Sequence, residues 1–365
     1  MKIGVAKESV AEEKRVALTP DAVKKLSGKG FEVQVETGAG LAAHFTDADY
    51  TAADASIVDN KTALAMGIVV KVRKPSQAEV AGLSDGSICI SLTETCGDDE
   101  ILSAMRAKNV TVLSMERIPR ISRAQSMDAL SSQSNIAGYR AVLEAASHFG
   151  RFIPLMMTSA GSAKPARVVI LGVGVAGLQA IATARRLGGD VYAYDIRPET
   201  KEQIESLGAK AIELDVGESG SGEGGYAKEL SDEAKARQQA ALADELSKAH
   251  VIITTAMIPC RPAPTLITED VVKRMREGSV IVDLAAATGG NCPLTEADKI
   301  VTKHGVIFIG HTNYPSMMPS DSSAFYAGNI TNLLNIMVDK TDAGLTLKNL
   351  DEDEITEAMQ VRAES

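Results

Sequence analysis

The chain has 365 residues, of which 45% are hydrophobic and 24% charged, a composition typical of a globular protein long enough to bury two separate cores. Its net charge of −10, without any basic run, argues against nucleic-acid binding. The four cysteines form neither a CxxC pair nor a zinc spacing, so we expect reduced thiols and no metal site.

The first third of the sequence alternates between strand-like and helix-like segments. The N-terminus enters a strand pattern directly, without the apolar stretch of a signal peptide, so we expect a cytoplasmic chain. The sequence Thr19-Pro20-Asp21 predicts a helix start, with Thr19 as the cap and the proline in the first turn. Strands are expected at 2–5, 31–36, 67–72, 87–92 and 110–115. This alternation predicts a parallel sheet with helices on its faces.

A polar segment runs from Arg120 to Asn135. Within it, Gln125, Asp128, Ser131 and Asn135 are spaced by three, three and four residues, which predicts that they share one face of a helix. That face fits either a solvated surface stripe or a hydrogen-bonding wall at a domain cleft, suited to a carboxamide and a ribose. In the second case, an ion pair between Asp128 and Arg120 would fix the arginine for such a contact.

A strand pattern at 167–171 runs directly into Gly172-Val-Gly174-Val-Ala-Gly177, and a helical segment and a second strand ending at Asp195 follow. Gly172 permits a tight turn, Gly174 lets the backbone approach a pyrophosphate, and Gly177 lets the helix pack close to the strand. The helix start offers N–H groups to phosphates, and Asp195 has the usual spacing of the acidic residue that binds the adenosine ribose. We therefore predict a site for a nicotinamide or flavin dinucleotide, with an ordinary glycine-rich turn as the alternative.

A second α/β unit surrounds this fingerprint. The apolar run that contains the three glycines is shorter than the roughly 20 residues of a spanning helix, so no membrane span is predicted. Strands are expected at 167–171, 190–194, 209–214, 250–256, 279–284 and 305–309, and long helical patterns at about 126–149 and 321–338 flank them. We predict an α/β fold of two Rossmann-like domains with parallel sheets, joined by long helices around a cleft. Residues 1–130 with 319–365 would form the first domain and 131–318 the dinucleotide-binding domain.

A glycine-rich segment, 215–225, is followed by Tyr226, and it fits either a flexible connector or a lid that closes over a ligand. The five histidines form no HExxH pattern and share no helical face, and the sequence contains no GxSxG motif. For His311 we expect a local hydrogen-bonding role. The sequence thus offers no evident general base.

Several longer motifs carry a family resemblance: Lys7-Glu8, Glu13-Lys-Arg-Val-Ala-Leu-Thr-Pro20, Arg120-Ile-Ser-Arg-Ala-Gln-Ser-Met-Asp-Ala-Leu-Ser131, the Gly172–Gly177 turn, Gly225-Tyr226-Ala-Lys, Thr254-Thr-Ala-Met-Ile-Pro259, Val282-Asp-Leu-Ala285 and Gly289-Gly-Asn-Cys292. With these motifs the whole chain resembles the soluble NAD(H)-binding alpha subunit, the first component, of proton-translocating NAD(P)+ transhydrogenase.

The resemblance implies which residues bind NAD(H). One group surrounds the nicotinamide end and would act in catalysis together with the loop tip Tyr226: Arg120, Gln125, Asp128 and Ser131. Asp195 would select NAD(H), because its carboxylate accepts from a ribose hydroxyl and repels a 2′-phosphate. The full set of implied cofactor-binding positions is Arg120, Gln125, Ser126, Met127, Asp128, Ser131, Gly172, Gly174, Val175, Ala176, Gly177, Asp195, Ile196, Arg197, Gly225, Tyr226, Gln238 and Met257.

The resemblance also implies a reaction and partners. The reaction is direct, Si/Re-specific hydride transfer from NADH to NADP+ carried by an NADP(H)-binding partner component, and it is coupled to proton translocation by membrane-spanning subunits. The chain would be a homodimer attached peripherally to the inner membrane through these partners.

Alanine dehydrogenase shares this fold and is the alternative. Alanine oxidation needs an acid–base group near the substrate carbon and cations for its carboxylate. Arg15 and the basic cluster Lys71–Lys74 would supply the cations. However, the stretch where that enzyme has its catalytic histidine reads Ser91-Leu-Thr-Glu94, and its catalytic aspartate falls near Ala287. The two missing groups favour the transhydrogenase reaction, which needs neither, and a non-catalytic NAD(H) sensor is a further alternative.

Overall fold

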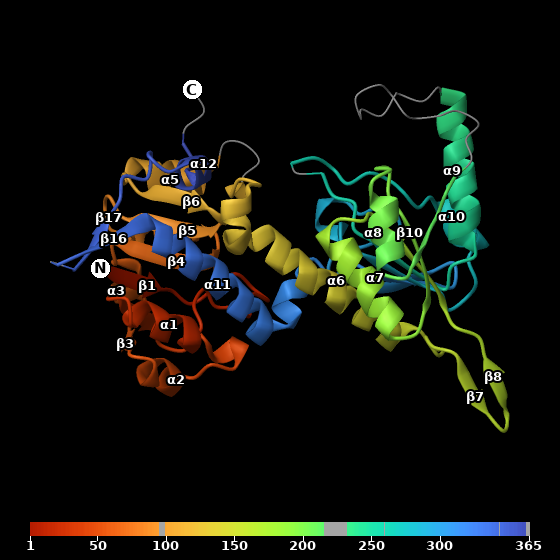
Figure 1. The fold of residues 1–365 in the computed structure, drawn as a ribbon, viewed down its shortest axis with the longest axis horizontal. Coiled ribbons are helices and arrows are strands. Elements are labelled where there is room, and N and C mark those ends of the chain that lie inside the picture. Colours follow the sequence, from red (N-terminus) through yellow and green to blue (C-terminus); the bar gives the residue numbers. More distant parts are fainter. Residues whose placement is uncertain (95–98, 215–231, 259, 343, 363–365) are drawn as a thin grey trace. The chain divides into compact units, whose positions relative to one another are not determined.

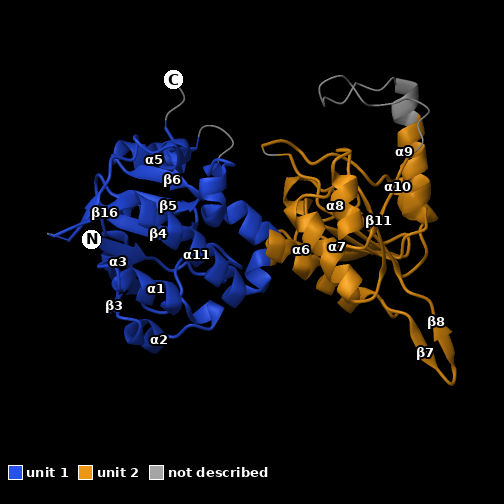
Figure 2. Cartoon of the chain, viewed as in Figure 1, with its two compact units in different colours: residues 1–134, 315–365 blue, residues 135–314 orange. Residues whose placement is uncertain are grey.

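The structure is a computed structural model that describes residues 1–94, 99–214, 232–258, 260–342 and 344–362. It divides into two compact units: unit 1 comprises residues 1–134 and 315–365, and unit 2 comprises residues 135–314 (Figure 2). The chain passes between the units within helix α6 (Ala129–His148) and again between Tyr314 and Pro315.

Unit 1 is built on an all-parallel sheet with the order β3-β2-β1-β4-β5-β6 (Figure 1). Its strands are β1 (Lys2–Val5), β2 (Glu32–Glu36), β3 (Ser56–Val58), β4 (Ile68–Arg73), β5 (Ile88–Leu92) and β6 (Thr111–Ser114). The strand order reverses between β1 and β4, which pair at Ile3 and Ile68. Their buried aliphatic side chains form one core with those of helix α11 (Pro319–Met337). This is the doubly wound order that the alternation of elements predicts.

The remaining helices of unit 1 are α1 (Pro20–Ser27), α2 (Asp47–Ala52), α3 (Asn60–Leu64), α4 (Gln77–Gly82), α5 (Glu100–Ala107) and α12 (Glu354–Met359). Helix α1 begins as predicted, because the Thr19 hydroxyl accepts the N–H of Ala22 and Pro20 occupies the first turn. The described residues of unit 1 also form the short 3₁₀ helices η1 (Leu41–Ala43), η2 (Met115–Arg117) and η3 (Ser122–Met127), and η6 (Tyr314–Met317) straddles the boundary.

Unit 2 repeats the same winding in the order β11-β10-β9-β12-β13-β15-β14. Its strands are β9 (Arg167–Leu171), β10 (Asp190–Tyr194), β11 (Lys210–Ala211), β12 (Val251–Thr254), β13 (Val280–Asp283), β14 (Ile300–Lys303) and β15 (Val306–Ile309). Its helices besides α6 are α7 (Val175–Arg186), α8 (Thr200–Ser206), α9 (Asp232–Ser247) and α10 (Glu269–Arg274), with a short 3₁₀ helix η5 (Ala286–Thr288). Within this seven-stranded sheet, the described strand pairs are parallel except β14 with β15, so the predicted fold of two Rossmann-like, mainly parallel sheets is confirmed.

The structure adds elements that the sequence patterns did not predict. These are β3, the antiparallel edge strand β14, helix α12, and two hairpins, β7 (Met156–Thr158) with β8 (Gly161–Ala163) and β16 (Val338–Thr341) with β17 (Gly344–Leu347). No described helix combines the length and the hydropathy that a bilayer span requires.

Candidate functional site

The glycine loop of unit 2 has the geometry of a dinucleotide-binding turn. Gly172 has a φ of 87°, and a Cβ there would lie 2.6 Å from the Thr255 hydroxyl. A Cβ on Gly177 would lie 2.0 Å from the carbonyl oxygen of Gly172, so α7 packs against the loop more closely than any side chain allows. Around Gly174, by contrast, no atom of the described residues other than its neighbours in the chain lies within 4 Å of the Cβ position, and no side chain among them caps α7. The loop is therefore closed on its inner side and open at the point where a phosphate would approach.

The loop lies at the point where the strand order of unit 2 reverses. It follows the carboxyl end of β9, and the neighbouring strand β12 ends beside it at Thr254. The backbone N–H of Thr255 donates to Leu171 at 2.8 Å, and its hydroxyl donates to the carbonyl of Gly172 at 3.0 Å. In open α/β sheets, ligands bind in the crevice at this reversal point. Thr255 thus fixes the turn, a role that the sequence analysis did not assign.

Asp195 follows β10 and is bonded to the same loop. One carboxylate oxygen accepts the N–H of Val173 at 2.7 Å, and the other accepts the backbone N–H and Nε of Arg197 at 2.9 and 3.0 Å. Burial favours the protonated carboxyl, but the Arg197 and Val173 bonds outweigh it and hold the pKa of Asp195 below its ordinary value. The group is therefore an anion at neutral pH, placed between the glycine loop and an exposed arginine.

Apolar side chains stand exposed next to these strand ends. Ile196 is 81% exposed directly after Asp195, and Met257 is 54% exposed after β12. On α9, Gln238 donates to the hydroxyl of Tyr194 at 3.0 Å, at the end of β10. Ile196 and Met257 thus lie on segments that leave the carboxyl edge of the sheet, where exposed apolar groups can pack against a planar nucleotide base, and Gln238 contacts the end of β10 from α9. All three are cofactor-binding positions implied by the resemblance.

A buried carboxylate, Asp283, organises the loops after β12 and β13. It accepts hydrogen bonds from five groups: the Thr254 hydroxyl, Ala285 N, Asn291 N, Cys292 N and the Thr295 hydroxyl. The side chain of Asn291 in turn donates to the carbonyls of Ala256 and Pro264, both at 2.8 Å. The motif containing Asp283 was part of the family resemblance, but its role as a hub follows only from the structure.

The polar segment of unit 1 differs from the predicted helical face. Asp128 has an extended backbone and caps α6: its carboxylate accepts the Ser131 N–H at 2.9 Å and the Ser131 hydroxyl at 2.6 Å. Gln125 therefore lies on the separate 3₁₀ helix η3, and the prediction of one continuous helical face is wrong. Although both residues are described, no ion pair joins Asp128 to Arg120, so the expected pairing is also wrong.

Accessibility differs along this polar segment. Arg120, Gln125 and Ser126 are exposed, whereas Met127 is buried in the core of unit 1. The Arg123 guanidinium is held by Asp353 through two bonds of 2.7 and 2.8 Å. Gly225 and Tyr226, and with them the predicted lid, lie outside the described residues.

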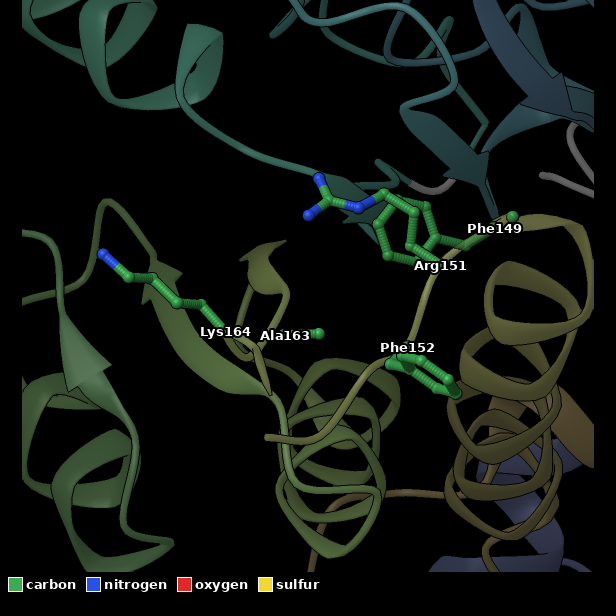
Figure 3. Close-up of a pocket in the computed structure, with 6 residues that line it drawn as sticks. Phe149, Arg151, Phe152, Ala163 and Lys164 are labelled. Atoms are coloured by element: carbon green, nitrogen blue, oxygen red, sulfur yellow. The ribbon is translucent and has the colours of Figure 1, made fainter. Parts of the chain in front are cut away.

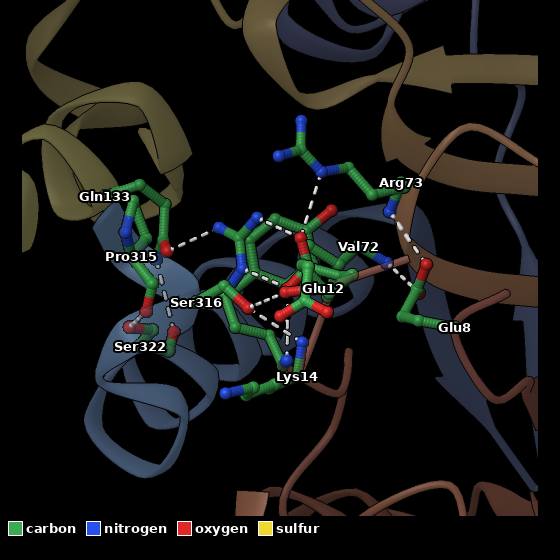
Figure 4. Close-up of polar contacts among 12 residues, drawn as sticks. Glu8, Glu12, Lys14, Val72, Arg73, Gln133, Pro315, Ser316 and Ser322 are labelled. Carbon is green, nitrogen blue, oxygen red and sulfur yellow. Dashed lines mark hydrogen bonds and ion pairs between the residues drawn. The ribbon is translucent and has the colours of Figure 1, made fainter. Parts of the chain in front are cut away.

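The basic side chains of unit 1 that could bind a substrate carboxylate already have partners, and Figure 4 shows Arg73 and Gln133 within this polar network. Arg15 bonds to Glu13 at 2.6 Å and to Gln133 at 2.8 Å. Arg73 contacts Glu13 at 2.9 Å and is also paired with Glu94. Lys71 forms ion pairs with Glu8 and Glu79. Lys74 forms an ion pair with Asp99.

Some expectations about single residues can be tested. The Nε2 of His311 lies 3.6 Å from a carboxylate oxygen of Glu144, and its ring packs edge-on against Tyr314, so the hydrogen-bonding role expected for it stays a prediction. Cys89 and Cys292 are free and buried, but Cys260 is disulfide-bonded, so the prediction of reduced thiols is wrong for that residue. Cys96 lies outside the described residues. Across the described ranges, no group of three or more potential ligands has a metal-binding arrangement.

A hollow of about 390 Å³ opens where α6 ends and the β7–β8 hairpin begins (Figure 3). Phe149 and Phe152 line it with Arg151 and Lys164. No residue implied in cofactor binding contributes to this hollow, so it is separate from the glycine loop.

Comparison with known proteins gives a consistent result. The family models "Alanine dehydrogenase/PNT, N-terminal domain" and "C-terminal domain" match residues 4–137 and 141–364. The first part of NAD(P) transhydrogenase subunit alpha from Rhodospirillum rubrum is 50% identical over 361 residues, covering 96% of this chain and 94% of that protein. Alanine dehydrogenase from Staphylococcus epidermidis is 30% identical over 334 residues, covering 88% and 84%. The crystal structure of transhydrogenase from Sinorhizobium meliloti has a TM-score of 0.90 at 42% identity, covering 99% and 98%.

Proposed function

The chain belongs to the alanine dehydrogenase/PNT family, and from this premise we propose that it acts as the NAD(H)-binding component of a proton-translocating transhydrogenase. In this proposal, NADH bound here supplies hydride from its dihydronicotinamide ring directly to NADP+ on a partner component, in the Si/Re-specific manner. The observation that carries the proposal is the glycine loop, which is open at Gly174 and bonded to Asp195, in a chain half identical to a transhydrogenase alpha subunit.

The proposal gives the loop residues distinct tasks. The uncapped N–H groups at Val175, Ala176 and Gly177 hold the pyrophosphate, because a helix start combines free donors with the positive end of the helix dipole. Asp195 accepts from the adenosine ribose, and its negative charge disfavours a 2′-phosphate. Arg197 already shares both oxygens of Asp195, so it orients that carboxylate rather than attracting a phosphate.

The nicotinamide end is assigned to the exposed polar residues of unit 1. Arg120 and Gln125 would orient the ring and its carboxamide, while the Asp128–Ser131 pair would supply oriented acceptors to the ribose. Tyr226 would close over the bound nucleotide and exclude water. Their contribution is positional, because hydride transfer requires the two rings to approach to roughly 3–3.5 Å.

The proposed hydride transfer requires neither of the catalytic groups of alanine dehydrogenase that this chain lacks. Hydride exchange between two nicotinamide rings releases no proton, so it needs no general base. Ala287 occupies the position expected for the dehydrogenase aspartate, and Glu94 is engaged with Arg73. The ion pair between Arg15 and Glu13 is buried. It disfavours an amino-acid substrate, because the carboxylate of that substrate would have to displace Glu13 from Arg15.

The proposal includes the assembly that the reaction requires. An NADP(H)-binding component and membrane-spanning subunits would complete the enzyme, and this chain would attach to the inner membrane through them as a homodimer. The transhydrogenase names of the relatives support this assignment.

The decisive experiment reconstitutes the purified chain with an NADP+-loaded partner component and 4-deuterated NADH. We expect the label to appear in NADPH and not in water, and we expect Gln125→Asn and Tyr226→Phe to slow this transfer. Unchanged rates in both variants would remove these residues from the mechanism. Reduction of pyruvate with ammonia and NADH at an enzymatic rate by the chain alone would instead establish an alanine dehydrogenase.

A further inference from the structure

Unit 1 has a second point of strand reversal, which the proposed function does not use. Its order also reverses between β1 and β4, and ligands of open α/β sheets bind at the carboxyl edge of such a reversal. Instead of a glycine loop, the segments that leave this edge carry charged residues: Glu8 after β1, Arg73 and Lys74 at the end of β4, and Glu94 after β5. A ligand-binding position of the fold is thus filled by side chains of the chain itself.

The charges of this cluster are arranged in two layers. In the inner layer, Lys71 is completely buried between Glu79 at 2.7 Å and Glu8 at 3.5 Å. Burial disfavours the charged form of Lys71, but its two carboxylate neighbours outweigh this effect and raise its pKa, so the lysine stays charged. In the outer layer, the Arg73 side chain is 20% exposed, with Nε bonded to buried Glu13 and Nη1 to Glu94. The Glu94 side chain is 68% exposed, so it covers Arg73 from the solvent side.

The carboxylate of Glu116 holds the backbone of Glu94 in this position. Glu116 accepts hydrogen bonds from the backbone N–H of Thr93 at 2.9 Å, from the Thr93 hydroxyl at 2.8 Å and from the N–H of Glu94. Glu94 itself has a φ of 50°, in the left-handed region that a residue with a side chain seldom adopts. A residue held in such a backbone conformation by specific bonds points to a required position for its side chain.

We propose that Glu94 is an internal carboxylate that closes a small-anion site at Arg73, so that unit 1 excludes short carboxylic acids such as 2-oxo acids. A guanidinium pairs with a carboxylate through two parallel hydrogen bonds, and Glu94 presents the same chemical group that such a ligand would. The inner ion pairs retain their own partners when Glu94 is removed. Arg73 alone then loses its outer carboxylate and becomes a receptor for a carboxylate from solution. Glu94 is thereby a specificity-determining residue, and this assignment is independent of hydride transfer.

The test compares Glu94→Ala with Asp353→Ala by calorimetric titration of the full-length chain with pyruvate. Both variants remove one carboxylate that pairs with an arginine of unit 1, so the change in net charge is the same. We expect Glu94→Ala to bind pyruvate at least about tenfold more tightly than the unmodified chain. Asp353→Ala should show no such gain, and lactamide, which lacks the carboxylate, should not bind the Glu94→Ala variant.

The double variant Glu94→Ala/Arg73→Gln identifies the receptor, because it should lose the gain in pyruvate affinity. Glu94→Gln keeps the side-chain shape and serves as the second variant should the alanine variant unfold, since it also removes the charge that closes the site. Equal pyruvate affinity in the unmodified chain and in the folded Glu94 variants would overturn the proposal. A gain that persists without Arg73, or that Asp353→Ala reproduces, would overturn it as well.

Discussion

Replacement of Gly174 by alanine should weaken NADH binding without unfolding the protein. The residue has φ −83° and ψ −166°, which any residue can adopt, and its Cβ would meet no atom within 4 Å among the described residues beyond its chain neighbours. Alanine restricts the unfolded chain and stabilises the fold by about 0.4–1 kcal/mol. Alanine is also a poorer helix cap than glycine, by about the same amount. These effects oppose each other, so the free energy of unfolding should change by less than about 1 kcal/mol.

The Gly174→Ala substitution should instead raise the dissociation constant of NADH. The new methyl group occupies the open space through which a phosphate reaches the N–H groups of α7. Losing one hydrogen bond to a charged group costs about 1.5–3 kcal/mol. The dissociation constant of NADH should therefore rise by about 10- to 150-fold. NADH fluorescence titration measures this constant, and urea unfolding of the same sample measures stability.

Gly177→Ala is the matched control, because its methyl group would lie 2.0 Å from the Gly172 carbonyl oxygen. Moving α7 to relieve this overlap should lower the free energy of unfolding by about 1–3 kcal/mol, as overpacking does elsewhere. The pair thus separates a methyl group that obstructs the ligand without straining the fold, at Gly174, from one that strains the fold itself, at Gly177. A stable Gly174→Ala variant that binds NADH within about twofold of the unmodified chain would refute the assignment of this loop to phosphate.

Three further predictions concern carboxylates. Asp195→Ala should weaken NADH binding by about 1–3 kcal/mol more than NADPH binding, and an unchanged NADPH/NADH ratio in paired titrations would contradict its selective role. Asp283→Ala should lower the free energy of urea unfolding by at least about 3 kcal/mol, because five donors lose a buried acceptor; a loss below about 1 kcal/mol would show that the loops repack. The Arg123 bonds lower the pKa of Asp353, so this pair stabilises the fold fully above the ordinary value of 3.8 and less as the pH falls through the lowered value. Thermal unfolding of Arg123→Ala should therefore vary less with pH in that acid range, and an identical pH profile would contradict this linkage.

The nucleotide loop was predictable because its signal is local. A buried run, 167–171, a glycine turn and a helix follow one another within the sequence, and each requires only its own residues to form. Strand β14 lacked such a signal. It is short, half exposed and ends in lysine, and it pairs antiparallel at the sheet edge, so the parallel rhythm of the other strands did not include it.

Asp128 illustrates how a side chain can override a correct helical period. The spacing from Gln125 to Ser131 fits a helix, but a carboxylate that accepts the N–H three residues ahead favours a helix start instead. Capping by aspartate was a possible signal here, although the helical spacing concealed it. The contact between Arg73 and Glu94 had no local signal at all, because 21 residues of chain separate the partners. The basic residues could be identified from the sequence, but the carboxylates that pair with them could be identified only from the structure.

The two sheets share a strand order but differ in what their reversal points can bind. In unit 2 the strand leads through one glycine turn into α7, whose first N–H groups have no side-chain cap. In unit 1 the long loop 6–19 separates β1 from α1, and the Thr19 hydroxyl already accepts an N–H at the start of that helix. A pyrophosphate needs free donors and close backbone approach, and among the described residues only unit 2 supplies both at its reversal point. This difference between the two units supports the proposal that NADH binds to the glycine loop of unit 2.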